Sequence, residues 1–146
     1  MRARYWTSFS FNFCVEFIRD LFRKESLGQY GERLAAQHLK RKRYKILHRG
    51  FEDARGEIDI VATDGETIVF CEVKTRSSDW AGLPVEAVDK KKQSTIQSTS
   101  QTYLRHFRLF DYPMRYDIIS VMLDDEGRPV IEHFEAAFER AEIRHR

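Results

Sequence analysis

The chain has 146 residues, of which 42% are hydrophobic and 33% are charged, and its formal net charge is +2. This length and composition are typical of one globular domain that can bury a sizeable core. The charge is too small to indicate a nucleic-acid partner by itself, and no apolar run approaches the ~20 residues that a membrane-spanning helix needs.

Residues 1–27 differ from the rest and are interpreted as an N-terminal extension. Aromatic residues alternate near residue 11, and apolar residues then recur at helical spacing at Phe13, Phe17 and Leu21. This pattern predicts an irregular start followed by a short amphipathic helix. We expect the extension to pack on a domain formed by residues 28–146; contact with a partner or a membrane surface is the alternative.

The rest of the chain predicts elements in the order α-β-β-β-α-β-β. Leu27-Gly28 is interpreted as a break, and an amphipathic helix is expected from Gln29. Later boundaries follow from strand patterns, a turn cluster at 124–129 and Pro84, which suits a first helical position. The expected strands are 44–47, 57–62, 67–75, 116–123 and 130–134, and the expected long helix is 85–107. The order indicates a mixed α/β fold with an antiparallel meander followed by a helical crossover.

Acidic residues interrupt the predicted hairpin GEIDIVATDGETIVFCEVK at 56–74. Asp64-Gly65 suits a two-residue hairpin loop. With this pair at the tip, Asp59 faces Phe70 and Glu57 faces Glu72. One face of the hairpin then carries Glu57, Asp59, Glu72 and Lys74. Asp59 and Glu72 become diagonal neighbours, and a slip of one residue would send them to opposite faces.

Two carboxylates this close on a partly buried face need a proton, a cation or water. Lys74 lies on the same face and can pair with Glu72, which would make the hairpin a solvated, ion-paired surface. A divalent metal is the other solution, because carboxylates, a carbonyl and water suit Mg²⁺ or Mn²⁺. In that case Lys74 can orient an attacking water or stabilise charge on a phosphate. The spacing alone leaves both interpretations open.

At these residues the sequence resembles the PD-(D/E)xK nuclease superfamily, which has a restriction-endonuclease-like core. Asp59 matches the first acid, and Glu72-Val73-Lys74 matches the E-x-K. The chain is more closely similar to the YraN-like family of predicted bacterial endonucleases, which are similar to Holliday-junction resolvases. The segments that carry this resemblance are GERLAAQHL at 31–39, GEIDIVA at 56–62, VFCEVKTR at 69–76, GLPVEAV at 82–88, KKQ at 91–93, RYDIISV at 115–121 and FEAAF at 134–138.

The resemblance implies a role for each residue of the motif. Asp59 and Glu72 would ligate the metal, with help from the carbonyl of Val73, and Lys74 would be the catalytic lysine. Glu32, on the first helix, matches an acid that resolvase-like nucleases bring to the same site. A solvated helix acid is the alternative for Glu32.

For other positions the resemblance implies no single role. Glu57 is either a metal ligand or an acid that lies beside the ligands. Asp117, in RYDII, is interpreted as structural rather than catalytic. Gly50 and Glu52 stand about where family members often carry an asparagine and an arginine. Acids at Glu52 and Asp53 would weaken a phosphate contact there.

Two basic clusters flank the predicted site along the chain. The stretch HLKRKRYKILHR at 38–49 holds six lysines or arginines and no acid. The cluster residues are Lys40, Arg41, Lys42 and Arg43 in the first and Lys90, Lys91 and Lys92 in the second. Such cations either form a solvated face or neutralise phosphates without reading the bases. Because no recognition-helix motif is present, structure-selective or nonspecific binding is favoured.

We therefore expect a metal-dependent endonuclease that hydrolyses phosphodiester bonds in DNA, with Mg²⁺ or Mn²⁺ as cofactor and branched DNA as a candidate substrate. The alternatives are a non-catalytic DNA-binding or adaptor protein on a nuclease fold, and a hydrolase of RNA or nucleotides. A homodimer and a partner for the N-terminal extension are further options. Two cysteines form no disulfide framework, and the N-terminus lacks a signal-peptide cleavage site, so we expect a cytoplasmic protein.

Overall fold

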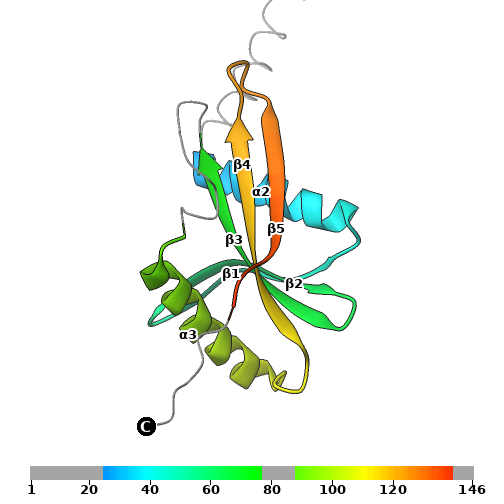
Figure 1. Ribbon diagram of the computed structural model, residues 1–146, viewed down its shortest axis with the longest axis vertical. Helices are drawn as coiled ribbons and strands as arrows, with labels where there is room; N and C mark the ends of the chain where they lie inside the picture. Colours follow the sequence, from blue (N-terminus) through cyan, green and yellow to red (C-terminus); the bar gives the residue numbers. More distant parts are fainter. Residues whose placement is uncertain (1–24, 77–87, 140–146) are drawn as a thin grey trace, which may run out of the picture.

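The structure is a computed structural model that describes residues 25–76 and 88–139. It is a mixed α/β fold with a five-stranded sheet (Figure 1). The elements are α2 (Leu27–Arg41), β1 (Lys45–Asp53), β2 (Gly56–Asp64), β3 (Thr67–Arg76), α3 (Lys90–Phe107), β4 (Met114–Leu123) and β5 (Pro129–Phe138). The predicted order α-β-β-β-α-β-β is confirmed for this part of the chain. The N-terminal helix expected around Phe13 and Phe17 lies outside the described residues.

The strands follow one another across the sheet in the order β1-β2-β3-β4-β5. β1, β2 and β3 form the expected antiparallel meander, whereas β3 and β4 are parallel. Parallel neighbours need a long crossover, and the connection that contains α3 supplies it. β5 then pairs antiparallel with β4 at the edge. Within 25–76 and 88–139, neither helix is long and apolar enough to cross a membrane.

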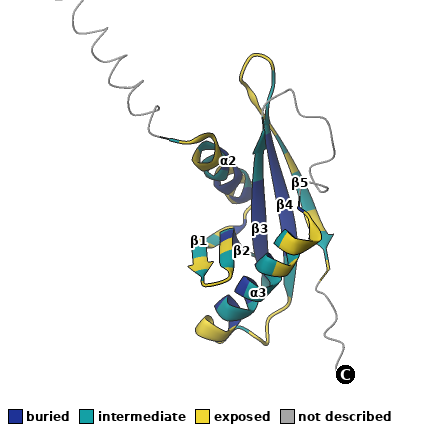
Figure 2. Ribbon diagram, turned by 90° about the vertical axis from the view of Figure 1, so that its left-hand side faces the viewer, coloured by how far each residue is buried: buried dark blue, intermediate teal, exposed yellow. Residues whose placement is uncertain are grey.

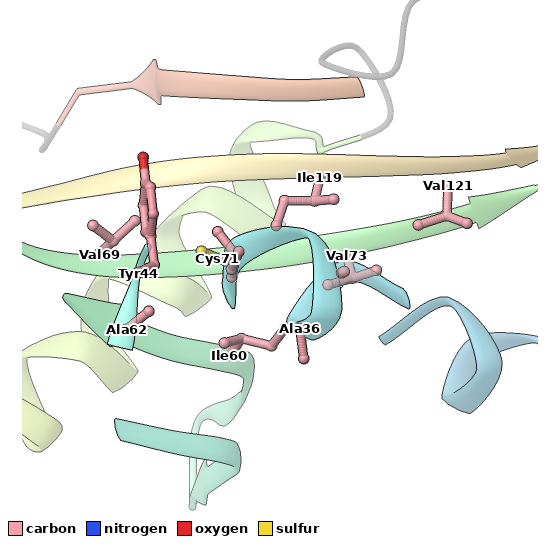
Figure 3. Packing of buried hydrophobic residues seen from close by; sticks show 11 residues of the cluster. Ala36, Tyr44, Ile60, Ala62, Val69, Cys71, Val73, Ile119 and Val121 are labelled. Carbon is pink, nitrogen blue, oxygen red and sulfur yellow. The ribbon is translucent and has the colours of Figure 1, made fainter. Parts of the chain in front are cut away.

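The sheet buries both of its faces in two separate hydrophobic clusters. Side chains of β3 alternate between them: Val69 and Cys71 belong to the cluster under α2, and Ile68 and Phe70 belong to the cluster under α3. Figure 3 shows the α2 cluster, in which Ala36 and Tyr44 meet apolar side chains of the sheet. Because residues 68–73 of β3 are buried, a polar side chain among them must find a partner within the protein.

The predicted hairpin turn is wrong by one position. Gly65 and Glu66 form the turn, so that Asp64 pairs with Thr67 and Val61 pairs with Phe70. Gly65 takes the first central position with φ of +59°, which glycine adopts readily in a type II′ turn. The partners therefore shift by two residues, and an even shift keeps the paired residues 60–64 and 67–71 on their predicted faces.

Both predicted helix starts are also wrong. α2 begins at Leu27, because Ser26 and Gln29 form a capping box: the Gln29 N–H donates to Ser26 Oγ at 3.2 Å, and the Ser26 N–H donates to Gln29 Oε1 at 3.0 Å. α3 begins at Lys90, because Asp89 is its N-cap and accepts a hydrogen bond from the Lys92 N–H at 2.8 Å. Pro84 lies outside the described residues. β1 and β5 extend beyond their predicted ends at Leu47 and Phe134.

Gly31 allows α2 to approach β3 closely. A Cβ added to Gly31 would lie 1.7 Å from Thr75 Oγ1, so no larger residue fits without movement of the helix or the strand. We therefore expect Gly31→Ala to lower the free energy of unfolding by about 1–3 kcal/mol through overpacking. Urea denaturation monitored by circular dichroism measures this change.

Gly28 provides the matched control, since it lies in the same helix. A Cβ there would meet only Ser26 Oγ, at 3.8 Å. Gly28→Ala should therefore leave stability unchanged or raise it by about 0.5–1 kcal/mol, as expected for alanine in place of glycine in a helix. If the two variants lost stability equally, the proposed close approach of Gly31 to Thr75 would be wrong.

Candidate functional site

The predicted acids lie where β2 separates from β3. Pairing between these strands ends at Ile60 and Cys71. The alternation of β2 also breaks here, because Ile58 belongs to the α3 cluster while Ile60 belongs to the α2 cluster. Asp59 lies between them, and its Oδ2 accepts a hydrogen bond from the Val73 N–H at 2.7 Å. The side chain of Asp59 thus takes the place of the strand partner that Val73 would otherwise have.

Glu72 is a buried carboxylate held by two lysines. Its side chain is only 3% exposed. Oε1 lies 2.7 Å from Lys74 Nζ and 3.2 Å from Lys92 Nζ, so one cation comes from β3 and the other from α3. Oε2 is buried and has no hydrogen-bond partner among the described residues. Glu72 is therefore compensated in charge but keeps one unused oxygen.

Two carboxyl groups near Glu72, those of Asp59 and Glu32, are harder to ionise than carboxyl groups in water. Burial, followed by the nearby charge of Glu72, raises the pKa of Asp59 to about 7, although the Val73 N–H and Lys92 act in the opposite direction. Burial also raises the pKa of Glu32, with Glu57 and Glu72 as further contributors and Arg49 as an opposing one. The site is therefore an acidic region that attracts a proton or a cation at neutral pH.

The structure brings most of the predicted site residues into one region, but not to equal distances. Asp59, Glu72 and Lys74 come together as expected. The charge of Glu32 acts on Asp59, and the charges of Glu57 and Glu72 act on Glu32. Glu57 Oε1 would lie 3.2 Å from a Cβ placed on Gly50. No group of three Asp, Glu, His or Cys side chains in the described ranges is close enough to hold a metal ion by itself.

The two basic clusters belong to opposite sides of the sheet. Lys90 and Lys91 are exposed at the start of α3, next to Lys92. The other cluster lies at the end of α2, where Lys42 Nζ bonds to Glu135 and to His133 Nδ1. Only the α3 cluster adjoins Glu72 directly. The sequence assigned Lys92 to a phosphate-binding group and missed its ion pair with Glu72, because no sequence pattern reveals which helix packs on which acid.

The contacts of Asp117 favour its structural interpretation. The carboxylate is fully buried and accepts hydrogen bonds from Arg115 Nε at 3.0 Å and from the Ala136 N–H at 3.0 Å. His133 Nε2 lies 2.8 Å from it. Ala136 has a positive φ of 49°, at an irregularity in the β4–β5 register. Asp117 therefore fixes the bulge of β5.

Comparison with known proteins places this sequence in a family. The model of a family described as "Uncharacterised protein family UPF0102" matches residues 31–121, which is more than half of the chain. The chain belongs to the UPF0102 family. This confirms the resemblance to YraN-like proteins.

The matches to individual UPF0102 relatives span most of the length of each relative. The protein from Geobacter metallireducens is 50% identical over 117 residues, which cover 80% of this chain and 95% of the relative. The protein from Alkaliphilus oremlandii is 47% identical over 116 residues, 78% of this chain and 98% of the relative. The protein from Geotalea uraniireducens is 43% identical over 117 residues, 80% and 92% respectively. Each is called "UPF0102 protein", a name that states no activity.

The raised pKa of Asp59 predicts a specific pH dependence of stability. In the unfolded chain an aspartate ionises near pH 4, whereas Asp59 in the folded protein has a pKa of about 7. The stability contribution of protonated Asp59 is therefore complete below about pH 4 and is lost as the pH rises through about 7. Without divalent cations, Asp59→Asn should be more stable than the wild type at about pH 8, and this advantage should vanish near pH 4.

Denaturation curves in a chelating buffer across this range test the prediction. The control is Glu66→Gln, which removes an exposed carboxylate at the tip of the β2–β3 hairpin. It should show no such pH-dependent gain. An Asp59→Asn advantage that is the same at both ends of the range would contradict the assignment of the shift to Asp59.

Proposed function

We propose that the protein is a metal-dependent endonuclease that hydrolyses phosphodiester bonds in DNA. The observation that carries the proposal is the grouping of Asp59, Glu72 and Lys74 where β2 leaves β3, with one buried oxygen of Glu72 unused. An apolar core gains nothing from such a group, because a buried carboxylate oxygen without a partner costs free energy. A ligand that uses this oxygen removes that cost.

The donors present fit a hard divalent cation. Asp59, Glu72 and the carbonyl of Val73 offer oxygen atoms, which suit Mg²⁺ or Mn²⁺. Mg²⁺ in particular is often held by one or two carboxylates together with water and substrate phosphate. The lack of a three-residue ligand cluster among the described residues is therefore compatible with this type of site. The raised pKa of Asp59 points the same way, since a cation would replace the proton.

The residues of the chain then have distinct roles in hydrolysis. When bound, a divalent ion would polarise the phosphodiester and lower the pKa of a water. Asp59 and Glu72 would hold that ion. Lys74, whose Nζ lies 2.7 Å from Glu72 Oε1, can orient the attacking water or stabilise charge that develops on the phosphate. Lys92 holds Glu72 in place from α3.

The start of α3 supports a phosphate partner. Lys90, Lys91 and Lys92 occupy the first turn of the helix, and that turn contains no acid. The helix dipole disfavours cations at this end, so helix stability does not explain the three lysines. Lys92 is used by Glu72, while Lys90 and Lys91 are exposed next to the acidic site. Phosphate neutralisation explains their position.

A non-catalytic DNA-binding or adaptor protein is the second candidate. It is favoured by the two lysines that already neutralise Glu72, because they make the site stable without a metal. Under this alternative the acids and lysines form a structural ion-pair network, and only the basic residues contact DNA.

A cleavage assay with Mg²⁺ or Mn²⁺ separates the two candidates. Single strands, duplexes, flaps and four-way junctions should be compared, with an RNA strand in parallel. We expect wild-type cleavage in at least one DNA substrate and a loss on the order of 100- to 1,000-fold in Lys74→Ala, because one charge-stabilising donor is removed. Arg128→Ala is the matched control, since Arg128 is an exposed cation of the β4–β5 turn, paired only locally with Asp124 and Glu126.

Titration calorimetry with Mn²⁺ measures metal binding separately from cleavage. The nuclease proposal expects binding that is weakened in both Asp59→Asn and Glu72→Gln. Wild-type protein that binds DNA but neither binds Mn²⁺ nor cleaves any substrate would favour the adaptor.

The salt dependence of DNA binding tests the role of α3. Each phosphate contact contributes about 0.9 to the log–log slope on duplex DNA. Replacing both Lys90 and Lys91 with Ala should therefore flatten the slope by up to about two units. Lys92 is kept, because its removal would also disturb Glu72.

The α2 cluster serves as the comparison. Lys40 and Arg41 are exposed at the far end of α2. If the duplex lies along α3, replacing these two residues with Ala should leave the slope at its wild-type value. Equal flattening by both pairs would show that DNA spans both clusters, and flattening by the α2 pair alone would remove α3 from the binding surface.

A further inference from the structure

Large aromatic side chains are exposed at the end of α3 and in the turn that follows it. Phe107 is 43% exposed, Phe110 is 55% exposed and Tyr112 is 50% exposed. These three occur within six consecutive residues, so the chain concentrates three exposed rings in one short stretch. Figure 2 shows the end of α3 and the connection to β4 largely in the colour of exposed residues.

The turn is fixed by its backbone and by one buried side chain. Arg108 ends the helix in the left-handed conformation, with φ of 56° and ψ of 46°. The Leu109 N–H donates to the Leu104 carbonyl at 2.8 Å, and Leu109 packs against the α3 cluster. Because Leu109 points inward, its neighbours Arg108 and Phe110 remain outside. The exposure of the aromatic residues is therefore built into the turn.

Phe107 is supported from behind by other rings. Its centroid lies 4.5 Å from that of Tyr103 and 4.6 Å from that of His106. Tyr103 in turn makes an edge-to-face contact with Phe51 of β1, with centroids 4.9 Å apart. The ring is thus held in position before any ligand binds, which lowers the entropy cost of stacking on it.

Positive charge is interleaved with these rings. Arg105 and Arg108 are exposed in the same stretch, and Asp111 is the one acid between residues 105 and 112. We name Arg105, Phe107, Arg108, Phe110 and Tyr112 the aromatic–arginine surface. Exposed rings together with arginines are the combination that proteins use to stack bases and hold the phosphates of single strands.

We propose that the aromatic–arginine surface binds unpaired bases in a single-stranded segment of the nucleic-acid substrate. The inference rests on the proposed function. α3 connects the two regions, since Lys92 contacts Glu72 and Phe107 is the last residue of the same helix. The helical rise between them is roughly 22 Å. That distance corresponds to six or seven steps of about 3.4 Å along a strand. A substrate with duplex near Lys90–Lys92 and unpaired bases a short distance away would reach both.

A second copy of the chain is a weaker occupant for this surface. A two-fold contact places the same patch on both sides of the interface. Arg105 and Arg108 would then meet like charges, which costs free energy unless acids from elsewhere intervene. Nucleic acid has the complementary charge, and its bases supply flat faces for the rings.

The proposal is tested by measuring affinity for three probes of about 15 nucleotides: a single strand, a duplex and an abasic single strand. Fluorescence anisotropy is measured with the full-length protein and a chelator, so that no cleavage occurs. In the double variant Phe110→Ala/Tyr112→Ala, affinity for the normal single strand should fall roughly fivefold to a hundredfold, because stacking is lost. Affinity for the duplex and the abasic strand should stay at wild-type values. Val130→Ala, at a 52% exposed site on β5, is the control and should change nothing.

A second variant tests the charge without disturbing the helix end. Arg108→Gly removes the guanidinium but suits the left-handed backbone that Arg108 adopts. We expect the salt slope for the single strand to flatten by about 0.7. If this variant kept the wild-type salt slope, Arg108 would not contact the phosphates of the strand.

The outcomes for this surface differ from those for the nuclease proposal. Wild-type single-strand affinity in the double variant, with cleavage of duplex or branched DNA intact, overturns the single-strand proposal alone. A double variant that changes the oligomeric state measured by light scattering, with all DNA affinities unchanged, also overturns it and assigns the surface to self-association. A wild-type protein that binds none of the probes in the chelating buffer overturns the single-strand proposal, whereas the nuclease proposal is decided separately by the cleavage assay with Mg²⁺ or Mn²⁺.

Discussion

The buried carboxylate of Glu72 imposes the constraint on which the candidate site depends. Residues 68–73 of β3 are buried between the two hydrophobic clusters, so the charge of Glu72 cannot be left to water. Lys74 meets that demand from the same strand and Lys92 meets it from α3. The ion pairs therefore tie the start of α3 to the middle of the sheet. This accounts for a lysine in a helix turn where the dipole disfavours positive charge.

Asp117 shows how the same protein treats a buried acid with a structural role. Arg115, His133 and the Ala136 N–H surround its carboxylate, and Arg115 extends the network to Asp64 and to the hydroxyl of Tyr44. Both oxygens of Asp117 are used. Glu72, by contrast, keeps Oε2 without a partner among the described residues, and its neighbour Asp59 has a raised pKa. This difference between a satisfied and an unsatisfied acid is what the proposed function uses to distinguish the structural position of Asp117 from the candidate metal site at Glu72.

The sequence predicted which face carries the acids but not the pairing that brings them together. The true hairpin turn at Gly65-Glu66 moves the register by an even number of residues, so the grouping of Asp59, Glu72 and Lys74 survived the wrong turn, although the alternation of β2 breaks between Ile58 and Ile60. Helix starts were missed because Ser26 and Asp89 cap them through side-chain hydrogen bonds that periodicity does not report. Lys92 was grouped with its neighbours by charge, since its partner Glu72 is distant in sequence and is reached only through helix packing.

If the protein has the proposed function, the charges of the site would connect metal binding to DNA binding. With Asp59 ionised, the charges of Asp59 and Glu72 balance those of Lys74 and Lys92, so these four side chains attract a phosphodiester only weakly without a metal. Both lysines contact Oε1 of Glu72, which leaves Oε2 and Asp59 to accept a cation without displacing either lysine. A divalent ion would then add two positive charges to this group of four side chains, and a phosphodiester would offset part of that charge. On this proposal the affinities for metal and DNA rise together, because each ligand neutralises charge that the other introduces, and the coupling is reciprocal by thermodynamic necessity.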